Sequence, residues 1–443
     1  MTRRILFYVP RNNNLRVVAP VIAHLVRQYA RNVSIRVAFP VWPISKAELQ
    51  PASEDFTRLF GDTVTCCPLI RPNELETVVR KGTDVIVTFM PEMAELKTEM
   101  VDRLRARSRS WGVTWVALPF VFNQDHFPLL NPDFVLRTWD IICTVGPASI
   151  RYVEEATRSW ADAKRKALLS RLAVTGYPAL DGIERLTTAA AIRQRYQLPS
   201  DGPIICVSPA PSFYPRVNSS RCARGLQARF RGTADRSVRG LVSRLTSYRY
   251  PFILGYRDYL SAIRRLAEAN EAVVVAKTRV KHDDPPYVKD SVDRIVGDES
   301  FFPTSALELL SVSDLYVGFQ SAMAVEAMAL GVYSLTALIF PLELENPAFT
   351  SYAALFRRPG GVWNVPGVSE SINGIGPTAR AGLRKLERFP LGTARLDEAR
   401  RLQFLADHFS WPCHASTRVA EILMLDAEPS AAVRPVAVAA APG

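Results

Sequence analysis

The stretch SDLYVGFQSAMAVEAMALG (residues 313–331) decides the fold class of this chain. A short apolar run ends at Gly318, a polar loop follows, and a helix opens near Ser321. With an apolar run at 332–336, this order predicts a β-α-β unit. Small residues at the start of the helix let its backbone approach a ligand, and the free N–H groups there suit a diphosphate. The stretch therefore predicts an α/β fold with a phosphate-binding edge.

The same alternation of short apolar runs and helical patterns extends outward over most of the chain. Continuous apolar runs separated by helical segments indicate parallel sheets that are covered on both faces. Strands are expected at residues 5–9, 33–39, 84–89, 114–118, 139–144, 203–208, 272–276, 293–296, 314–318 and 332–336. Helices are expected at 17–29, 152–172, 187–196 and 322–330.

The pattern restarts between about residues 175 and 200, so the chain is expected to hold two α/β domains. We place an N-terminal Rossmann-like domain at 1–175 and a C-terminal one at 176–425, which carries an Arg-rich insertion at 216–249 and whose terminal helix could pack back on the N-terminal domain. The last segment, 426–443, is rich in Ala, Pro and Val and is expected to be a disordered tail.

Composition favours a globular protein with anionic partners. The chain has 443 residues, of which 48% are hydrophobic and 22% charged, and its formal net charge is +12. The six cysteines match neither a zinc motif nor a disulfide framework, which indicates a reducing compartment. No apolar run approaches the roughly 20 residues that cross a bilayer.

Two groups of residues in the second half are candidates for binding a nucleotide donor. In the deciding stretch these are Gln320, Ser321, Ala322 and Glu326. The Glu326 carboxylate could accept hydrogen bonds from ribose hydroxyls. After the strand at 272–276, basic side chains could neutralise charge on a departing diphosphate. These are Lys277, Arg279, Lys281 and His282. A turn glycine and a solvated basic loop remain the plain structural alternatives.

Four segments in order resemble motifs of GT-B glycosyltransferases and of CDP-glycerol glycerophosphotransferases. The deciding stretch resembles their donor-side loop and Glu-Ala-Met-Ala-x-Gly helix, and residues 276–283 resemble their Lys-x-His-Pro loop. Residues 174–181 resemble a junction segment that UDP-N-acetylglucosamine 2-epimerases also carry, and residues 414–420 resemble a closing helix. The resemblance covers about residues 170–425. It implies a GT-B-like fold, in which two parallel sheets face a central cleft, and metal-independent transfer with His282 at the donor phosphates.

The motifs also depart from the family pattern. The polymerases' Asp-Tyr-Ser-Ser loop is Gly318-Phe319-Gln320-Ser321 here, and Asp283 replaces the proline after the histidine. These departures weaken the polyol-phosphate interpretation more than the glycosyl-transfer one.

The first half offers candidates for the acceptor side. Asp125, His126 and Glu92 follow expected strands, and each could be the base that deprotonates an acceptor hydroxyl. Arg11 and Asn13 follow the first strand and could contact an acceptor or a phosphate, but the glycines of a dinucleotide fingerprint are missing there. Helix capping and surface exposure are the structural alternatives for these residues.

The segment Arg216–Arg249 holds nine arginines and one acidic residue. Guanidinium groups bind phosphate bidentately, so this segment could meet an anionic acceptor or a membrane surface, or could be a solvated loop. Its aromatic residues are sparse, which argues against nucleic acid as a partner.

The sequence thus predicts a glycosyltransferase that moves a sugar from a nucleotide-sugar to a hydroxyl of a cell-surface glycan or glycolipid. The nucleotide-sugar is a co-substrate, and we expect no cofactor and no metal site. Polyol-phosphate transfer, sugar-nucleotide 2-epimerisation and non-catalytic binding of an anionic polymer stay open as alternatives. The expected location is the cytoplasm, including the inner face of the membrane.

Overall fold

The chain forms two compact units, each built around its own sheet. Unit 1 comprises Met1–Arg185, Phe301–Pro303 and Leu402–Gly443, and unit 2 comprises Leu186–Ser300 and Thr304–Arg401. The computed structural model describes residues 2–41, 53–89, 98–119, 132–208, 256–278, 286–297, 300–318, 321–338, 364–373, 379–392, 394–412 and 414–425.

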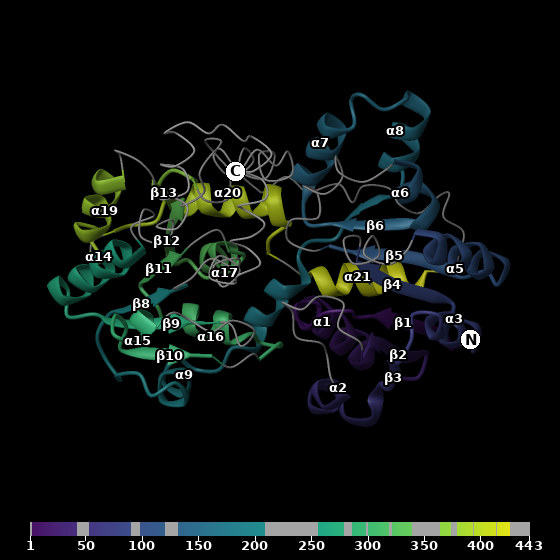
Figure 1. Ribbon diagram of the computed structural model, residues 1–443, viewed down its shortest axis with the longest axis horizontal. Coiled ribbons are helices and arrows are strands. Elements are labelled where there is room, and N and C mark those ends of the chain that lie inside the picture. The colour runs from purple at the N-terminus through teal and green to yellow at the C-terminus, as the bar shows by residue number, and fades with distance from the viewer. Residues whose placement is uncertain are drawn as a thin grey trace, which may run out of the picture. The chain divides into compact units, whose positions relative to one another are not determined.

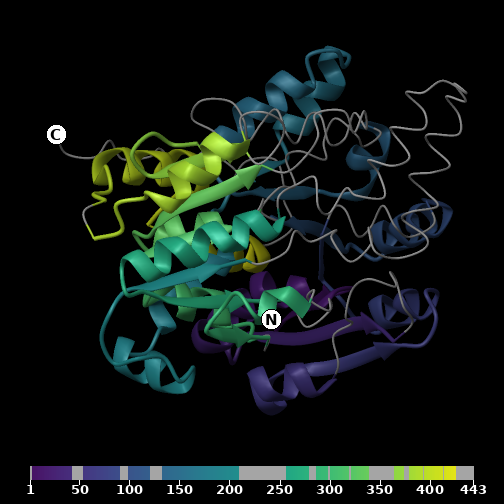
Figure 2. The ribbon, with the colours of Figure 1, turned by 60° about the vertical axis from the view of Figure 1, so that its left-hand side comes forward.

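Unit 1 contains a seven-stranded parallel sheet in the order β3-β2-β1-β4-β5-β6-β7. The arrows of its purple and blue strands point the same way in Figure 2. The chain adds strands on one side of β1 and then on the other, so the strand order reverses between β1 and β4. The strands are β1 (Arg3–Tyr8), β2 (Val33–Pro40), β3 (Thr65–Leu69), β4 (Val85–Phe89), β5 (Thr114–Leu118), β6 (Ile141–Thr144) and β7 (Leu172–Val174).

Unit 1 also contains helices, most of which connect these strands. They are α1 (Asn12–Tyr29), α2 (Ser53–Phe60), η1 (Gly61–Thr63), α3 (Glu74–Arg80), α5 (Thr98–Ser110), α6 (Pro132–Thr138), α7 (Pro147–Ala156), α8 (Asp162–Leu169), the 3-10 segment η3 (Pro178–Arg185) and α21 (Ala415–Met424). The single helix expected over 152–172 is therefore wrong. It is broken after Ala156, where the Thr157 hydroxyl bonds back to the Val153 carbonyl and the Trp160 N–H bonds to the Thr157 carbonyl.

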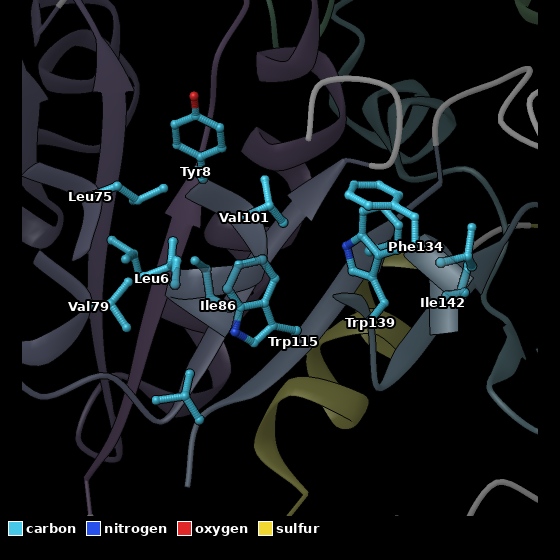
Figure 3. Close-up of a cluster of buried hydrophobic side chains, with 14 of the residues drawn as sticks. Leu6, Tyr8, Leu75, Val79, Ile86, Val101, Trp115, Phe134, Trp139 and Ile142 are labelled. Atoms are coloured by element: carbon cyan, nitrogen blue, oxygen red, sulfur yellow. The ribbon is translucent and has the colours of Figure 1, made fainter. Parts of the chain in front are cut away.

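Two tryptophans anchor a core on one face of the unit 1 sheet (Figure 3). Trp115 and Trp139 are fully buried, and each indole N–H is satisfied, by the Ser108 and Thr88 hydroxyls respectively, both at 2.8 Å. Phe134 meets Trp139 edge to face, with the ring centroids 5.8 Å apart. Satisfied indole groups let these large side chains bury their apolar area without leaving a polar atom unpaired.

Unit 2 contains a six-stranded sheet in the order β10-β9-β8-β11-β12-β13, again with parallel pairs. Its strand order reverses between β8 and β11. The strands are β8 (Ile204–Val207), β9 (Val273–Lys277), β10 (Arg294–Val296), β11 (Leu315–Gly318), β12 (Tyr333–Leu338) and β13 (Ser369–Asn373).

Helices α14 and α19 cover one face of this sheet and share its apolar core (Figure 1). Helices α16 and α17 pack against each other, and α17 contacts β11 and β12. The helices of unit 2 are α9 (Ala189–Arg195), α14 (Tyr256–Ala269), α15 (Pro286–Lys289), α16 (Ser305–Ser311), α17 (Met323–Ala329) and α19 (Ala379–Glu387). Helix α20 (Glu398–Phe409) begins in unit 2 and continues into unit 1.

The predicted α/β class with two parallel sheets is confirmed. In the described ranges, no helix is both long enough and apolar enough to cross a membrane. The buried strand cysteines have the role expected of small apolar side chains, because burial raises the pKa of Cys143 and of Cys206 to about 12 and keeps both thiols protonated.

Candidate functional site

The reversal of strand order in unit 2 places a candidate site at the carboxyl ends of β8 and β11. In open parallel sheets, connections leave in opposite directions at such a point, and the ends of the two central strands are left open to a ligand. Ser208 follows β8, and its backbone N–H extends the ladder to the Val317 carbonyl at 3.0 Å. The deciding stretch follows β11, so the two segments meet at this edge.

Three hydroxyl groups gather there, from Ser208, Tyr316 and Ser321, which we call the hydroxyl cluster. The Ser208 Oγ lies 3.0 Å from the Tyr316 Oη, and the Ser321 side chain lies near the same phenol. The Met323 backbone N–H donates to the Ser321 Oγ at 3.3 Å, and the Ser208 hydroxyl donates to the Met323 sulfur at 3.3 Å. Burial raises the pKa of Tyr316 well above its ordinary value, so the phenol is neutral.

Gly318 makes room for the Tyr316 hydroxyl. A Cβ atom at position 318 would lie 2.1 Å from the Tyr316 Oη and 2.4 Å from its Cζ. Residues two apart on a strand share a face, so the tyrosine ring lies along the strand over the glycine. The glycine that ends the strand therefore serves the close approach of a side chain, in addition to the turn that the sequence suggests.

The sheet face that carries Tyr316 is polar, whereas the opposite face holds the apolar core. Register partners in a parallel sheet point to the same face. Cys206, Tyr316 and Ser334 are paired in one row, and Gly318 pairs with Thr336 in the next. Ser334 and Thr336 are buried, and among the described residues their hydroxyl oxygens have no hydrogen-bond partner.

Replacing Thr336 with valine is expected to leave the protein as stable as before, or about 1 kcal/mol more stable, because the change removes a buried hydroxyl that bonds to none of the described residues. The matched control is Thr88→Val, another fully buried strand threonine, whose hydroxyl accepts the Trp139 indole N–H at 2.8 Å. That change should cost about 1–2 kcal/mol because it leaves a buried donor unpaired. Urea denaturation of both variants checks the contrast, and equal losses would contradict it.

Four of the predicted donor-binding residues lie in the described part of unit 2. Ser321 belongs to the hydroxyl cluster, and Ala322 is the N-cap residue of α17. Lys277 ends β9, next to β8, and its Nζ donates to the Thr278 carbonyl at 2.6 Å. Glu326 lies in α17 with its side chain fully buried. Sequence analysis missed Ser208 and Tyr316, although Ser208 ends an expected strand as a polar residue after an apolar run.

Apart from Arg11 and Asn13, the other predicted residues of the two binding sides fall outside the described residues. They are Glu92, Asp125, His126, Arg279, Lys281, His282, Gln320 and the segment Arg216–Arg249. Within the described ranges, no three His, Cys, Asp or Glu side chains gather closely enough to hold a metal ion.

In unit 1, Arg11 and Asn13 stand where the strand order reverses, after β1. Arg11 is the N-cap residue of α1, and its backbone N–H donates to the Asn14 Oδ1 at 3.0 Å. Asn14, which the sequence did not single out, is fully buried, whereas Arg11 and Asn13 are half-buried. Arg11 and Asn13 thus border the carboxyl edge of this sheet, while Asn14 has a capping role.

Two of the four family-like segments meet inside unit 1. Asp181 in η3 accepts backbone N–H groups from Ala415 (3.2 Å) and Ser416 (2.6 Å), and so caps α21 from a distant part of the chain. Arg418 in α21 donates to the Thr175 carbonyl at 2.6 Å. Helix α21 also packs on α1, and the two lie side by side in Figure 1. These motif residues therefore hold unit 1 together.

A pocket of unit 1 lies beside this capping contact. Its lining includes His24 and Arg27 of α1, Glu184 of η3, and His414 and Ser416 at the start of α21. Glu184 lies 3.3 Å from the His414 ring nitrogen, and burial lowers the pKa of His24. Because acidic and basic groups are mixed here, the pocket does not select one sign of ligand charge.

No protein-family model matches the sequence, and no curated protein matches it. Solved structures do match the fold. The putative UDP-N-acetylglucosamine 2-epimerase of Listeria monocytogenes has a TM-score of 0.55 and 12% identity, over 95% of each chain.

Two further structures contain ligands by their descriptions. UDP-GlcNAc 2-epimerase of Neisseria meningitidis bound to UDP-GlcNAc has a TM-score of 0.53 and 12% identity, over 95% of this chain and 99% of that one. Arabidopsis thaliana UGT89C1 complexed with UDP has a TM-score of 0.51 and 9% identity, over 96% and 99%. With the two parallel sheets, these likenesses show that the fold is GT-B-like, as the sequence resemblance implies.

Proposed function

We propose that this chain is a glycosyltransferase that moves a sugar from a nucleotide-sugar to a hydroxyl of a cell-surface glycan or glycolipid. The observation that carries the proposal is the hydroxyl cluster at the point where the strand order of unit 2 reverses. Polar donors at that edge suit an anionic ligand. The likeness to folds described with bound UDP and UDP-GlcNAc supports a nucleotide-sugar as that ligand.

The proposed donor site uses groups that stabilise a leaving diphosphate. The Ser321 hydroxyl and the backbone beside Ala322 would donate hydrogen bonds to phosphoryl oxygens, and Lys277 would supply positive charge. We leave Glu326 out of direct contact with the ribose, because its side chain is fully buried. Arg279, Lys281, His282 and Gln320 are proposed to complete the site.

On the acceptor side, one of Glu92, Asp125 and His126 is proposed as the base. A transfer that inverts the anomeric carbon needs a group that takes the proton of the attacking hydroxyl. Arg11 and Asn13, at the carboxyl edge of the unit 1 sheet, are proposed to position the acceptor or its phosphate. A glycan or lipid-linked acceptor and an anionic membrane surface at Arg216–Arg249 belong to this proposal.

A second candidate function is epimerisation of a nucleotide-sugar at C2. It is favoured by the highest TM-scores reported above, which belong to proteins described as 2-epimerases. The two candidates separate in one experiment without acceptor. An epimerase converts UDP-GlcNAc into its C2 epimer, which proton NMR resolves, whereas a transferase leaves that configuration unchanged.

Nucleotide binding tests the donor site that both candidates share. In a thermal-shift screen of UDP, GDP, CDP, CMP and ADP, one nucleotide should stabilise the protein by about 2.7 kcal/mol at 100 times its Kd. Ser321→Ala should lower the affinity for that nucleotide about tenfold or more, since one hydrogen bond to a charged group is lost.

The matched control is Ser200→Ala, which removes an exposed hydroxyl before β8, at the opposite end of the strand. It should leave the nucleotide affinity unchanged. A protein that binds none of the five nucleotides would refute the donor site.

A further inference from the structure

We infer that unit 1 docks onto an anionic membrane surface with the amino edge of its sheet, the edge at which the strands begin. In a parallel sheet with helical crossovers, each helix ends at this edge, because the next strand starts there. The N-terminus and helices α3 and α5 mark this edge in Figure 1. It is opposite to the edge that Arg11 and Asn13 border, and it is separate in sequence from Arg216–Arg249, the membrane segment of the proposed function.

Cations are concentrated in the segments that lead into the strands at this edge. They precede or open β1, β2 and β4 to β7, and they are Arg3, Arg4, Arg31, Arg80, Lys81, Arg107, Arg109, Arg137 and Arg171. All of them except Arg3 and Arg171 are exposed. The edge therefore presents a row of basic side chains to solvent, spread over neighbouring strands of one sheet.

Acidic partners neutralise only part of this charge. In the segments that contain the cations, the acidic residues are Asp84 and Asp140. Including two acids further back on α3 and α5, the ion pairs are Arg4–Asp84, Arg105–Asp140, Arg107–Glu76 and Arg137–Asp102. The remaining exposed cations have no acidic side chain within ion-pair distance among the described residues, and these are Arg31, Arg80, Lys81 and Arg109. A net positive potential remains at the edge.

Contacts along the edge make the row continuous. A Cβ atom on Gly82 would lie 2.5 Å from a guanidinium nitrogen of Arg4, so the turn that carries Lys81 lies against the start of β1. The Arg109 guanidinium donates to the Arg137 carbonyl at 3.1 Å, which joins the end of α5 to the end of α6. Strands β4 and β5, which these turns enter, are direct neighbours.

Two exposed apolar side chains lie at the same edge. Trp111, in the turn between α5 and β5, is 38% exposed, and Leu425, which follows α21, is 45% exposed. The Arg3 guanidinium donates to the Leu425 carbonyl at 2.6 Å, so Leu425 lies beside β1, about 10 Å or two strand spacings from β5. An indole joins an apolar body to a polar N–H, a combination that favours the headgroup level of a bilayer.

Helix dipoles account for some of these cations but not for the whole surface. Basic residues in the last turns of α3, α5 and α6 complement the negative ends of those helices. Arg31 and Lys81, however, lie beyond the helix ends, and an exposed tryptophan adds nothing to a dipole. A nucleic acid would meet the same charges but offers no apolar layer for the aliphatic Leu425. An anionic membrane offers both headgroup charge and an apolar layer, and it is the occupant to which we commit.

Flotation of the full chain with lipid vesicles tests the surface. Wild type should bind vesicles of phosphatidylcholine with phosphatidylglycerol much more strongly than vesicles of phosphatidylcholine alone. Lys81→Gln and Arg109→Gln should each lower the partition coefficient on the anionic vesicles about fivefold, and Trp111→Ser about tenfold. The matched control is Arg71→Gln, which removes an exposed arginine after β3, at the opposite edge of the sheet, and should leave binding unchanged.

Quenching of tryptophan emission by brominated lipid in the same anionic vesicles is the second measurement. Trp111→Phe keeps an aromatic ring at the surface, so it should bind nearly as well as the wild type and yet lose much of the quenching. Trp115 and Trp139 are fully buried and cannot contact lipid.

Two results would overturn the inference. One is a wild type that does not bind the anionic vesicles, whether or not it binds duplex DNA. The other is equal binding by wild type, Arg109→Gln and Trp111→Ser, which would assign any membrane contact to another part of the chain. Neither result bears on the nucleotide screen, and a protein that binds no nucleotide would leave this docking surface standing.

Discussion

Alanine at position 146 is expected to lower the free energy of unfolding by about 3 kcal/mol or more, at the upper end of overpacking costs. A Cβ atom there would lie 2.3 Å from the His408 carbonyl carbon, 2.4 Å from its oxygen and 2.7 Å from the Asp407 oxygen. These are backbone atoms, which cannot turn aside as a side chain end can. Gly146 also caps α7, so relief of the collision must move either that helix or α20.

Urea denaturation of Gly146→Ala measures this cost. Gly392→Ala is the matched control, because nothing lies within 4 Å of a Cβ atom at that position and its φ is not in the left-handed region. There the substitution should be neutral or stabilise by up to about 1 kcal/mol, by restricting the unfolded chain. Similar midpoints for the two variants would show that α7 and α20 can separate at little cost.

Removing the Asp181 carboxylate is the second change with a large expected effect. Asp181→Ala should lower the free energy of unfolding by about 2–4 kcal/mol, from the loss of a helix cap and of hydrogen bonds to a charged acceptor. The side chain is only 8% exposed, so water cannot replace it easily at the Ala415 and Ser416 N–H groups. The stability of Asp181→Asn should fall between that of the wild type and that of Asp181→Ala, since asparagine keeps one acceptor oxygen without the charge.

Asp162→Ala tests whether any carboxylate in the first turn of a helix contributes as much to the free energy of unfolding as Asp181 does. Asp162 opens α8, with 78% of its side chain exposed, and pairs with Arg165 at 3.0 Å. Its removal should change stability by about 0.5 kcal/mol at most, as for other exposed pairs. Fluorescence-monitored urea curves for both sites decide the matter, and comparable losses would mean that burial of the Asp181 cap adds nothing.

The strands that the sequence did not predict share one physical property. They are β3, β7 and β13, and each lies at the edge of its sheet. An edge strand has a neighbour on one side only and need not be apolar on both faces. Strand β13, with the sequence SESIN, and β3, with TCCPL, show this clearly. The central strands, buried on both faces, left the continuous apolar runs that made them predictable.

The candidate site was predictable where it depends on one stretch of chain and not where it depends on the fold. Ser321 and Ala322 follow directly from the strand, loop and helix at 313–331. The role of Tyr316 was not visible, because within a strand of alternating residues it resembles any buried aromatic side chain. Its hydroxyl becomes significant only when β8 brings Ser208 alongside, a pairing across more than 100 residues of sequence.

The contact between Asp181 and the helix Ala415–Met424 is a second case, in unit 1, of a feature that depends on the fold. From the sequence they resemble family motifs near the two ends of a C-terminal domain. In the structure, Asp181 caps α21, and both belong to unit 1. That the terminal helix could pack back on the first domain was expected, but sequence spacing carries no information on the residue, Asp181, that caps it from so far away in the chain.

This arrangement constrains the order in which the protein can be completed during translation. Unit 1 begins at the N-terminus, yet the helix that packs on α1 and that Asp181 caps is made only after every strand of unit 2 has been synthesised. Domains usually fold in the order in which they leave the ribosome. Here the part of α1 that α21 covers must wait, so we expect the nascent chain to be more exposed to aggregation and to chaperones during synthesis of unit 2.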